Sequence, residues 1–584
     1  MLALFFEWNA LKTTSRNQEC ERATQARMDV SLLPDYLCDI KALRENIRVI
    51  QYLSLLAYET LFDKNKEIKL TFSNSALERL NIPNNVIKYC LNIGILTEEQ
   101  DVSLPASSSQ QSLFSFFHKS LQEYLAAVYV ASRLKEMLKS LKLFPNYDDD
   151  LADVCKTCLR KYFGTCKTVV DILDQSNVLI MLCGLEPQLL TNVSEYIYDV
   201  TLVDKSAVQE RNTVPQDSFS SNHHNLIKDI QMCIFMCIEE AMSSAKNVHT
   251  PVYIADIYVS HSTDLLRYCE YVVSKYVLSI DLDRFWCFMK KTDNETVYLA
   301  VKHLGKCDQL KAIKSSISDD RINNEITKIL DTNVFTLETV SFLETDKKII
   351  THLVSILPKM QQLTSLQMKG TISDRIPHDV CSSLCTYLNQ NTSLNHIAFN
   401  IYSEKFCMVS CNIDNLETCT LSIENVDMMK QMCNCLCEAD KLKHLELYAG
   451  FFMRSYKTVT KNLTRLLPSL VSLSSLTLWD FSFTDNIIAR PCDIKNLKEI
   501  TLQEVTLSLP TWCKFIDSLP ALPQVATVET FDMDIRDGTI LEIRICDIEQ
   551  KAAARQYVRE KTNLFRVTRD DTFGFCFTTK KVRL

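Results

Sequence analysis

Glycine is scarce in this sequence of 584 residues. The chain holds 8 glycines, whereas an average content of about 7% would give roughly 40. A Walker A loop needs two glycines five positions apart, and a dinucleotide-binding fingerprint needs three within six positions. The closest two glycines, Gly164 and Gly184, are 20 positions apart. The sequence therefore excludes both of these phosphate-binding loops.

Long apolar runs are missing as well. The segment NVLIMLCGL at 177–185 is about half of the roughly 18 residues that a membrane span requires. The first residues, MLALFFEW, lack a basic flank and a small-residue cleavage site, so we do not interpret them as a signal peptide. The sequence therefore predicts no membrane span.

An excess of positive charge is also absent. The net charge is −8 and the pI is near 5.8, so nothing attracts the whole chain to nucleic acid or to an anionic membrane. The hydrophobic share of 46% and the charged share of 23% are ordinary for a globular protein. A chain of this length is too long for one hydrophobic core, so about three to four domains are expected.

The 24 cysteines form no recognisable metal or disulfide framework. The segment CKTC at 155–158 is followed by Cys166, but a zinc site usually needs two well-spaced pairs. We therefore expect reduced cysteines in a cytoplasmic protein, with no metal site. A nucleophile elbow and an HExxH motif are absent too, so no catalytic residue is predicted and we do not expect an enzyme.

The first recognisable module spans residues 31–118. Helical spacing is followed by a helix start at Ser73 or Asn74, a second short helix, and two short strands around a polar loop, which is the order of a winged-helix domain. Many such domains bind DNA, but residues 29–104 hold eight Lys or Arg against eleven Asp or Glu. The candidate recognition helix carries only Lys88. We therefore expect this module to pack against protein and not to bind nucleic acid.

Residues 119–332 are predicted to form a second, all-helical domain, because apolar residues recur there at four-residue spacing. Within it, the polar and breaker-rich segment 204–225 is predicted as a mobile loop. The pair His223 and His224 lies in this segment without acidic or cysteine neighbours, which favours solvated histidines over a metal site.

From residue 333 the period changes to a short unit, Leu-x-x-apolar-x-apolar, often preceded by an amphipathic helix. A strand, a turn and a helix in every 22–31 residues are typical of a leucine-rich-repeat solenoid, which we expect over 333–530. A conventional α/β domain with parallel strands is the alternative. The units begin at Leu337, Leu363, Leu394, Leu416, Leu442, Leu473 and Leu497, with a weaker one at Leu522.

One part of the leucine-rich pattern is missing. An Asn or Cys normally stands three positions after the last apolar residue of the strand, where it satisfies inner backbone groups. Without this row of Asn or Cys side chains we expect an irregular solenoid. The basic stretch 551–584 is expected to cover its open end, or else to dock an acidic partner. The positions that lack Asn or Cys are Thr371, Tyr402, Glu424, Gly450, Phe481 and Val505.

The segment FSFFHKSLQEYLAA at 114–127 resembles the end of the winged-helix domain in NOD-like receptors, whose motif is approximately Phe-x-His-x-Ser-Phe-Gln-Glu-Phe-x-Ala-Ala. IMLCGL at 180–185 resembles a segment of their second helical domain, and MLALFFEW looks like a helix of their first helical domain. The matching motif residues are Phe116, His118, Ser120, Gln122, Glu123, Tyr124, Ala126 and Ala127.

The order of parts is similar to that of this family over nearly the whole chain. The resemblance implies a multidomain, mainly α protein followed by an α/β leucine-rich-repeat solenoid. Its parts are a remnant of the first helical domain at 1–30, a winged helix at 31–118, a second helical domain at 119–332, leucine-rich repeats at 333–530, and a C-terminal cap with a basic tail at 531–584.

The resemblance also implies a function. The chain would be a non-catalytic innate-immune sensor or regulator that binds protein or microbial ligands through its repeat surface. The alternatives are a general leucine-rich-repeat scaffold or adaptor, and a fragment of a nucleotide-switched receptor whose nucleotide-binding domain lies before residue 1. No cofactor is expected, except ADP or ATP in that last case.

By the same resemblance, His118 corresponds to a histidine that contacts the β-phosphate of bound ADP. From the residues themselves, Ser120 and Glu123 match a capping box, which places His118 at a strand-to-helix corner beside unpaired N–H groups. Such a corner also suits an anion. Because the rest of a nucleotide site is missing, we favour a structural role for His118 over nucleotide sensing.

Overall fold

The computed structural model separates the chain into two compact units. Unit 1 holds the chain up to Arg211 together with 219–258 and 264–277, and unit 2 holds 278–584 with two short earlier segments. The expected helical remnant at 1–30 lies outside the described residues, as do His223 and His224. The structure describes residues 34, 40–62, 71–100, 112–141, 147–212, 225–244, 250–259, 264–282, 294–316, 319–370, 376–400, 412–423, 425–449, 456–483, 494, 496–522, 526–531, 534–535, 548–570 and 574–580.

The first module of unit 1 joins short helices to a small antiparallel sheet of order β1-β3-β2. Phe72, Phe114 and Phe116 alternate along β1 and β3 and are buried. The ring centroid of Phe72 lies 6.2 Å from that of Phe114 and 5.9 Å from that of Phe116. Ser73 occupies the N-cap position of α6, as one of the two predicted starts required. The elements are α4 (Lys41–Glu45), α5 (Ile47–Leu61), β1 (Thr71–Ser73), α6 (Asn74–Arg79), α7 (Asn84–Asn92), β2 (Leu96–Gln100) and β3 (Ser112–Phe116).

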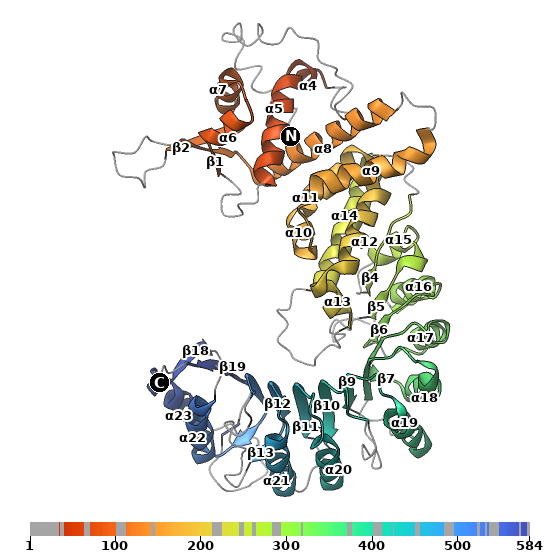
Figure 1. Cartoon of the computed structure of the whole chain (residues 1–584), viewed down its shortest axis with the longest axis vertical. Coiled ribbons are helices and arrows are strands. Elements are labelled where there is room, and N and C mark those ends of the chain that lie inside the picture. The colour runs from red at the N-terminus through yellow and green to blue at the C-terminus, as the bar shows by residue number, and fades with distance from the viewer. Residues whose placement is uncertain are drawn as a thin grey trace. The chain divides into compact units, whose positions relative to one another are not determined.

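The rest of unit 1 is built mainly of helices. The long helix α8 packs against α5 and α11 (Figure 1). Helical spacing predicts an inward face of Leu121, Tyr124, Leu125 and Val128 on α8; the three aliphatic residues are buried and Tyr124 is half-buried. The helices are α8 (Lys119–Leu141), α9 (Tyr147–Phe163), α10 (Val169–Asp174), α11 (Ser176–Leu185), α12 (Leu190–Val203), α13 (Lys205–Asn212), α14 (Leu226–Ser244) and α15 (Asp264–Cys269).

Part of the loop predicted at 204–225 is wrong, because Lys205–Asn212 form helix α13. Asp204 caps this helix, because one carboxylate oxygen accepts from the N–H of Ala207 at 2.9 Å and the other accepts from the N–H of Val169 at 3.2 Å. The polar composition of the segment misled the prediction, since its charged side chains are fixed by tertiary partners. Residues 213–224 lie outside the described part of the chain.

A 13-stranded sheet has the order β18-β19-β16-β14-β12-β11-β10-β9-β8-β7-β6-β5-β4. Unit 2 is dominated by its strands from β5 to β19, whereas β4 belongs to unit 1 up to Tyr258. Its strands from β5 to β16 are parallel, and in Figure 1 the helices of this unit lie along one side of them. The strands are β4 (Asp256–Val259), β5 (Ser279–Leu282), β6 (Ala312–Ser315), β7 (Thr339–Thr345), β8 (Ser365–Gly370), β9 (His396–Asn400), β10 (Thr418–Ile423), β11 (His444–Ala449), β12 (Ser475–Trp479), β14 (Glu499–Gln503), β16 (Thr527–Phe531), β18 (Phe565–Asp570) and β19 (Gly574–Thr579).

The predicted register holds for the strands β7 to β14, each of which begins two residues after its predicted leucine. The weaker unit at Leu522 is wrong in register, since Val528 is the residue that aligns with Ile500 of β14. The helices between the strands are α16 (Asn294–Leu304), α17 (Asp320–Thr332), α18 (Lys347–Ile356), α19 (His378–Gln390), α20 (Val426–Leu436), α21 (Tyr456–Leu466) and α22 (Leu509–Ser518).

The all-helical prediction for 119–332 is wrong at three places, because β4, β5 and β6 belong to the same sheet as the later units. The sequence does carry the signal, as the repeated unit starts at Ile254 and Val277, and at Leu310 with Ser315 in place of its last apolar residue. Two of these starts have Ile or Val in place of leucine. Short β-branched runs of this kind cannot be told from buried helix by periodicity alone.

A different side-chain ladder takes the place of the missing Asn or Cys. At four units, the polar residue immediately before the first leucine donates to a backbone carbonyl of the preceding unit. These bonds satisfy carbonyls in the turns between units. The pairs are Thr336 Oγ1 to Leu310 O at 2.7 Å, Ser393 Oγ to Leu363 O at 2.8 Å, Asn415 Nδ2 to Thr392 O at 2.8 Å, and Asn496 Nδ2 to Val471 O at 2.6 Å.

The last units end in a second small sheet and a hairpin. Phe481 and Val505, at two of the positions that lack Asn, are fully buried beside short parallel strands β13 (Ser482–Phe483), β15 (Thr506–Leu507) and β17 (Asp534–Ile535). Strand β19 pairs antiparallel with β16 and covers its edge, while α23 (Ile548–Glu560) precedes β18. Among the described residues, no helix is both long and apolar enough to cross a membrane.

Candidate functional site

The strands of unit 2 present two chemically different faces. In β11, Leu445 and Leu447 are buried toward the helices, whereas His444, Glu446 and Tyr448 alternate with them on the opposite face. In parallel strands with matched register, equivalent positions form continuous rows, such as Thr420, Glu446, Thr477 and Thr501. We call the face opposite the helices the open face. Side chains on it are available to a partner wherever they are exposed.

Exposure along the open face is uneven. On β7 and β8 its polar side chains are almost fully buried, with Thr339 at 0% and Ser341 at 1% exposed. From β10 onward the equivalent residues, including Thr420 and Thr477, are half-buried and reach solvent. The accessible part of the open face that the structure describes therefore lies on β10 to β14.

One carboxylate organises this accessible part. Glu446 Oε1 accepts from Tyr448 Oη and from Trp479 Nε1, both at 2.9 Å, and Oε2 accepts from Thr420 Oγ1 at 3.2 Å. The rings of Tyr448 and Trp479 stack with their centroids 5.0 Å apart. We call these four residues the Glu446 cluster. Its aromatic side chains are held in fixed rotamers, so ordering them on binding costs little conformational entropy.

His396 and His444 lie on the same face, in the row that also contains Thr418. The Nε2 atom of His396 is buried and has no hydrogen-bond partner among the described residues. Burial, followed by the nearby His444, lowers the pKa of His396 from 6.5 to about 4, so the ring is neutral at pH 7. His444 is exposed on the next strand but one.

His118 stands at the strand-to-helix corner that the sequence predicts, between β3 and α8. Its Nδ1 accepts the N–H of Ser120 at 3.1 Å, and its carbonyl accepts the N–H of Leu121 at 3.1 Å. His118 is therefore itself the cap of α8, and its ring is exposed. His118 therefore stabilises the start of α8 through contacts that need no nucleotide.

The predicted capping box of Ser120 and Glu123 is wrong. Glu123 is 3% exposed and faces the helical core, where its Oε2 accepts from Asn177 Nδ2 at 3.1 Å. Lys119 Nζ lies 3.3 Å from its other oxygen. The motif fails here because a carboxylate on the buried side of α8 finds a better partner on α11 than the backbone at the helix start.

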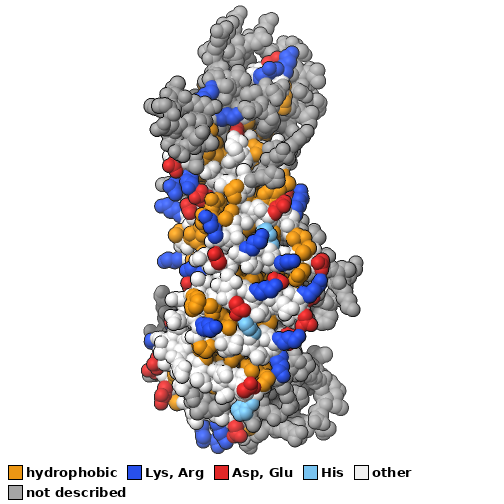
Figure 2. Space-filling view, turned by 90° about the vertical axis from the view of Figure 1, so that its right-hand side faces the viewer, with side chains coloured by type: hydrophobic (Ala, Val, Ile, Leu, Met, Phe, Trp, Pro, Cys, Tyr) orange, Lys and Arg blue, Asp and Glu red, His pale blue; other side chains and the backbone are white. Residues whose placement is uncertain are grey.

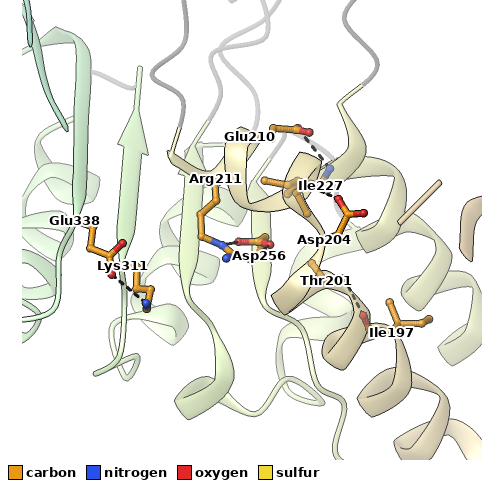
Figure 3. A network of polar contacts seen from close by, with 10 residues as sticks. Ile197, Thr201, Asp204, Glu210, Arg211, Ile227, Asp256, Lys311 and Glu338 are labelled. Carbon is orange, nitrogen blue, oxygen red and sulfur yellow. Dashed lines mark hydrogen bonds and ion pairs between the residues drawn. The ribbon is translucent and has the colours of Figure 1, made fainter. Parts of the chain in front are cut away.

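A buried ion pair joins α13 to β4 within unit 1. Figure 3 shows Arg211 pointing at the carboxylate of Asp256, and both side chains are almost fully buried. On the same helix, Glu210 Oε2 accepts the N–H of Leu226 at 3.2 Å, at the start of α14. These contacts fix α13 in place, so we assign the pair to structure and not to binding.

The cysteines take part in packing. Burial raises the pKa of Cys155 to about 11 and that of Cys158 to about 12, which keeps both as thiols at pH 7. No two described cysteines form a disulfide. Within the described residues, no group of three or more His, Cys, Asp or Glu side chains is placed to hold a metal ion.

Sequence reasoning missed the Glu446 cluster. Its residues occupy the variable positions of LKHLELY and LSSLTLW, which periodicity marks as solvent-facing but does not single out. A Tyr and a Trp at the same position of adjacent units is the signal that could have found them. In comparisons with known proteins, the chain matches no protein-family model and no curated protein.

Proposed function

We propose that this chain is a non-catalytic, cytoplasmic binding protein of the NOD-like receptor type, which recognises a protein or microbial ligand through the accessible open face of unit 2. The observation that carries the proposal is the Glu446 cluster. Tyr448 is half-buried, and Trp479, which is 9% exposed, fixes its ring by stacking against it; aromatic residues held in this way dominate binding energy at protein interfaces.

The order of elements supports the same interpretation. We interpret the module from α5 to β3 as a winged helix, the helices from α8 to α14 as a second helical domain, and the strand–helix units as degenerate leucine-rich repeats. Helix α7 carries Lys88 as its single basic residue, which suits a role other than DNA binding. Buried thiols fit a reducing compartment.

The experiment compares the proteins retained by the purified, immobilised full chain and by two arginine variants. Thr477→Arg places a bulky charge beside Glu446 on the accessible face. Val471→Arg introduces the same residue at a position that is 57% exposed in the turn before β12. We expect quantitative mass spectrometry of retained extract proteins to show a subset lost with Thr477→Arg and kept with Val471→Arg.

A direct measurement of binding affinity then separates specific recognition from nonspecific adsorption. For any retained partner, Trp479→Ala should weaken binding by about tenfold or more, since truncating an aromatic anchor costs more than about 1.4 kcal/mol. Thermal unfolding of the variant confirms that it is folded. Identical partner sets for the parent and both arginine variants would place recognition away from the open face and contradict the proposal.

A further inference from the structure

The helical side of unit 2 carries charges of both signs with single hydrophobic side chains between them (Figure 2). Tyr298 of α16 belongs to this unit and is half-buried. Its phenol has no hydrogen-bond partner among the residues that the structure describes. The phenolic oxygen can therefore be covalently modified, and the charges of the neighbouring side chains decide which modification they stabilise.

Two cations lie over the ring of Tyr298, and a third stands further along the next helix. The guanidinium carbon of Arg321 on α17 lies 5.1 Å from the ring centroid of Tyr298, and Nζ of Lys302 on α16 lies 5.9 Å from it. Lys328, two turns after Arg321 on α17, also interacts electrostatically with the phenol. Lys302 and Arg321 thus lie against one side chain at the α16–α17 contact, and Lys328 is on the same helix as Arg321.

Arg321 is at present paired with an exposed carboxylate, and Lys328 with a largely buried one. Arg321 Nη1 lies 2.6 Å from Glu295 Oε2, and Lys328 Nζ lies 2.8 Å from Glu325 Oε1. The pair of Arg321 with Glu295 is exposed on both sides, so it contributes little and exchanges easily. A phosphate dianion offers three strong acceptor oxygens and forms stronger charge-assisted bonds with Arg and Lys.

We propose that Tyr298 is a phosphorylation site, whose phosphate binds Lys302, Arg321 and Lys328 and fastens α16 to α17. In the reaction, the γ-phosphorus of a nucleoside triphosphate forms a bond to the phenolic oxygen and loses its bond to the β–γ bridging oxygen. The nucleoside diphosphate leaves, and the phenol proton passes to a base of the kinase.

Two other tyrosines of unit 2 differ from Tyr298 because their phenols donate to carboxylates. The phenol of Tyr448 donates to Glu446, and that of Tyr557 donates to Asp517, so a phosphate on either would face a carboxylate. Like charges in contact destabilise the modified form. Tyr557 also has a cation over its ring, with Lys561 Nζ 4.4 Å from the centroid. Tyr298 therefore differs from these two residues in that its phenol donates to no carboxylate among the described residues.

The first arm of the test asks whether the site is modified. The full chain is treated with a tyrosine kinase of broad specificity and Mg-ATP, and phosphopeptides are mapped by mass spectrometry. We expect phosphate on Tyr298 in the parent and its loss in Tyr298→Phe. A folded parent that stays unmodified at Tyr298 after prolonged treatment overturns the proposal.

The second arm measures what the phosphate does. Phosphotyrosine is installed at position 298 of the full chain by codon suppression. We expect Tm to rise by roughly 2 °C or more, and the phosphate titration followed by ³¹P NMR to move about one unit below its usual midpoint near pH 6.

Matched variants of the modified chain identify the cause. Arg321→Ala and Lys328→Ala should each reduce both shifts, whereas Lys347→Ala, which removes an exposed lysine at the start of α18, should leave them unchanged. An unchanged Tm and titration midpoint in the modified parent, or equal losses in all three variants, would contradict phosphate binding by these residues.

Discussion

The guanidinium of Arg211 donates two parallel hydrogen bonds to the carboxylate of Asp256, with Nε and Nη2 at 2.6 and 2.7 Å from the two oxygens. Their side chains are 4% and 3% exposed, so the two charges neutralise each other inside unit 1. Breaking such a pair from one side leaves the other charge buried and uncompensated.

Asp256→Ala is therefore expected to lower the free energy of unfolding of unit 1 by about 3–5 kcal/mol, as measured by denaturant unfolding. The double variant Arg211→Met, Asp256→Leu should recover most of this loss, because it removes both charges. Arg160→Ala, at an exposed pair with Asp199, is the control and should cost less than about 1 kcal/mol. Equal losses for the buried and the exposed pair would contradict this account.

Leu445 tests the register of the sheet. It is 1% exposed and aligns with Cys419 and Leu476 on the neighbouring strands. Leu445→Asp buries an unpaired carboxylate between units, so we expect it to cost more than about 4 kcal/mol and to unfold unit 2. Thr501→Asp, on the half-buried opposite face, should stay folded in circular dichroism. A Leu445→Asp chain that melts like the parent would show that the register is wrong.

Because His396 is buried, we expect the free energy of unfolding to depend on pH. Its pKa is lowered from 6.5 to about 4 in the folded chain, mainly by burial, so the unfolded chain takes up this proton first as the pH falls. Stability is then lost between pH 6.5 and pH 4, by up to about 3 kcal/mol. His396→Gln should flatten unfolding curves measured across this window, while the exposed His378→Gln should not. The same slope in the parent and in His396→Gln would exclude this origin.

His118 predicts a capping effect. His118→Ala removes the acceptor for the N–H of Ser120, so we expect a loss of about 1 kcal/mol in unfolding free energy. His118→Asn can still cap the helix and should retain most of the stability. Neither change should affect nucleotide affinity in calorimetric titration. ADP binding to the parent, but not to His118→Ala, would favour nucleotide sensing instead.

The isolated chain is expected not to hydrolyse ATP. Its closest glycines are too far apart for a phosphate loop, and no recognisable motif places a magnesium-binding acid. Phosphate release by the homogeneous protein should equal the buffer blank. Turnover that follows the protein through successive columns would show that a catalytic site is assembled from residues that no linear motif connects.

The sequence by itself determined the repeating units of unit 2. Leucines such as Leu442 and Leu473 recur in phase, and a side chain at such a position has to be buried between strand and helix in every unit. The same local rules located the strand-to-helix corner at His118. These features can be predicted from the sequence because each depends on residues only a few positions away.

Only the tertiary structure decided the contacts between distant segments. Arg211 finds Asp256 across 45 positions, and Glu123 leaves its predicted cap for Asn177 across 54 positions. The Glu446 cluster likewise exists because matched strand register places Trp479 beside Tyr448. Polar side chains have several possible local partners of similar energy, and burial next to a specific distant group selects one of them.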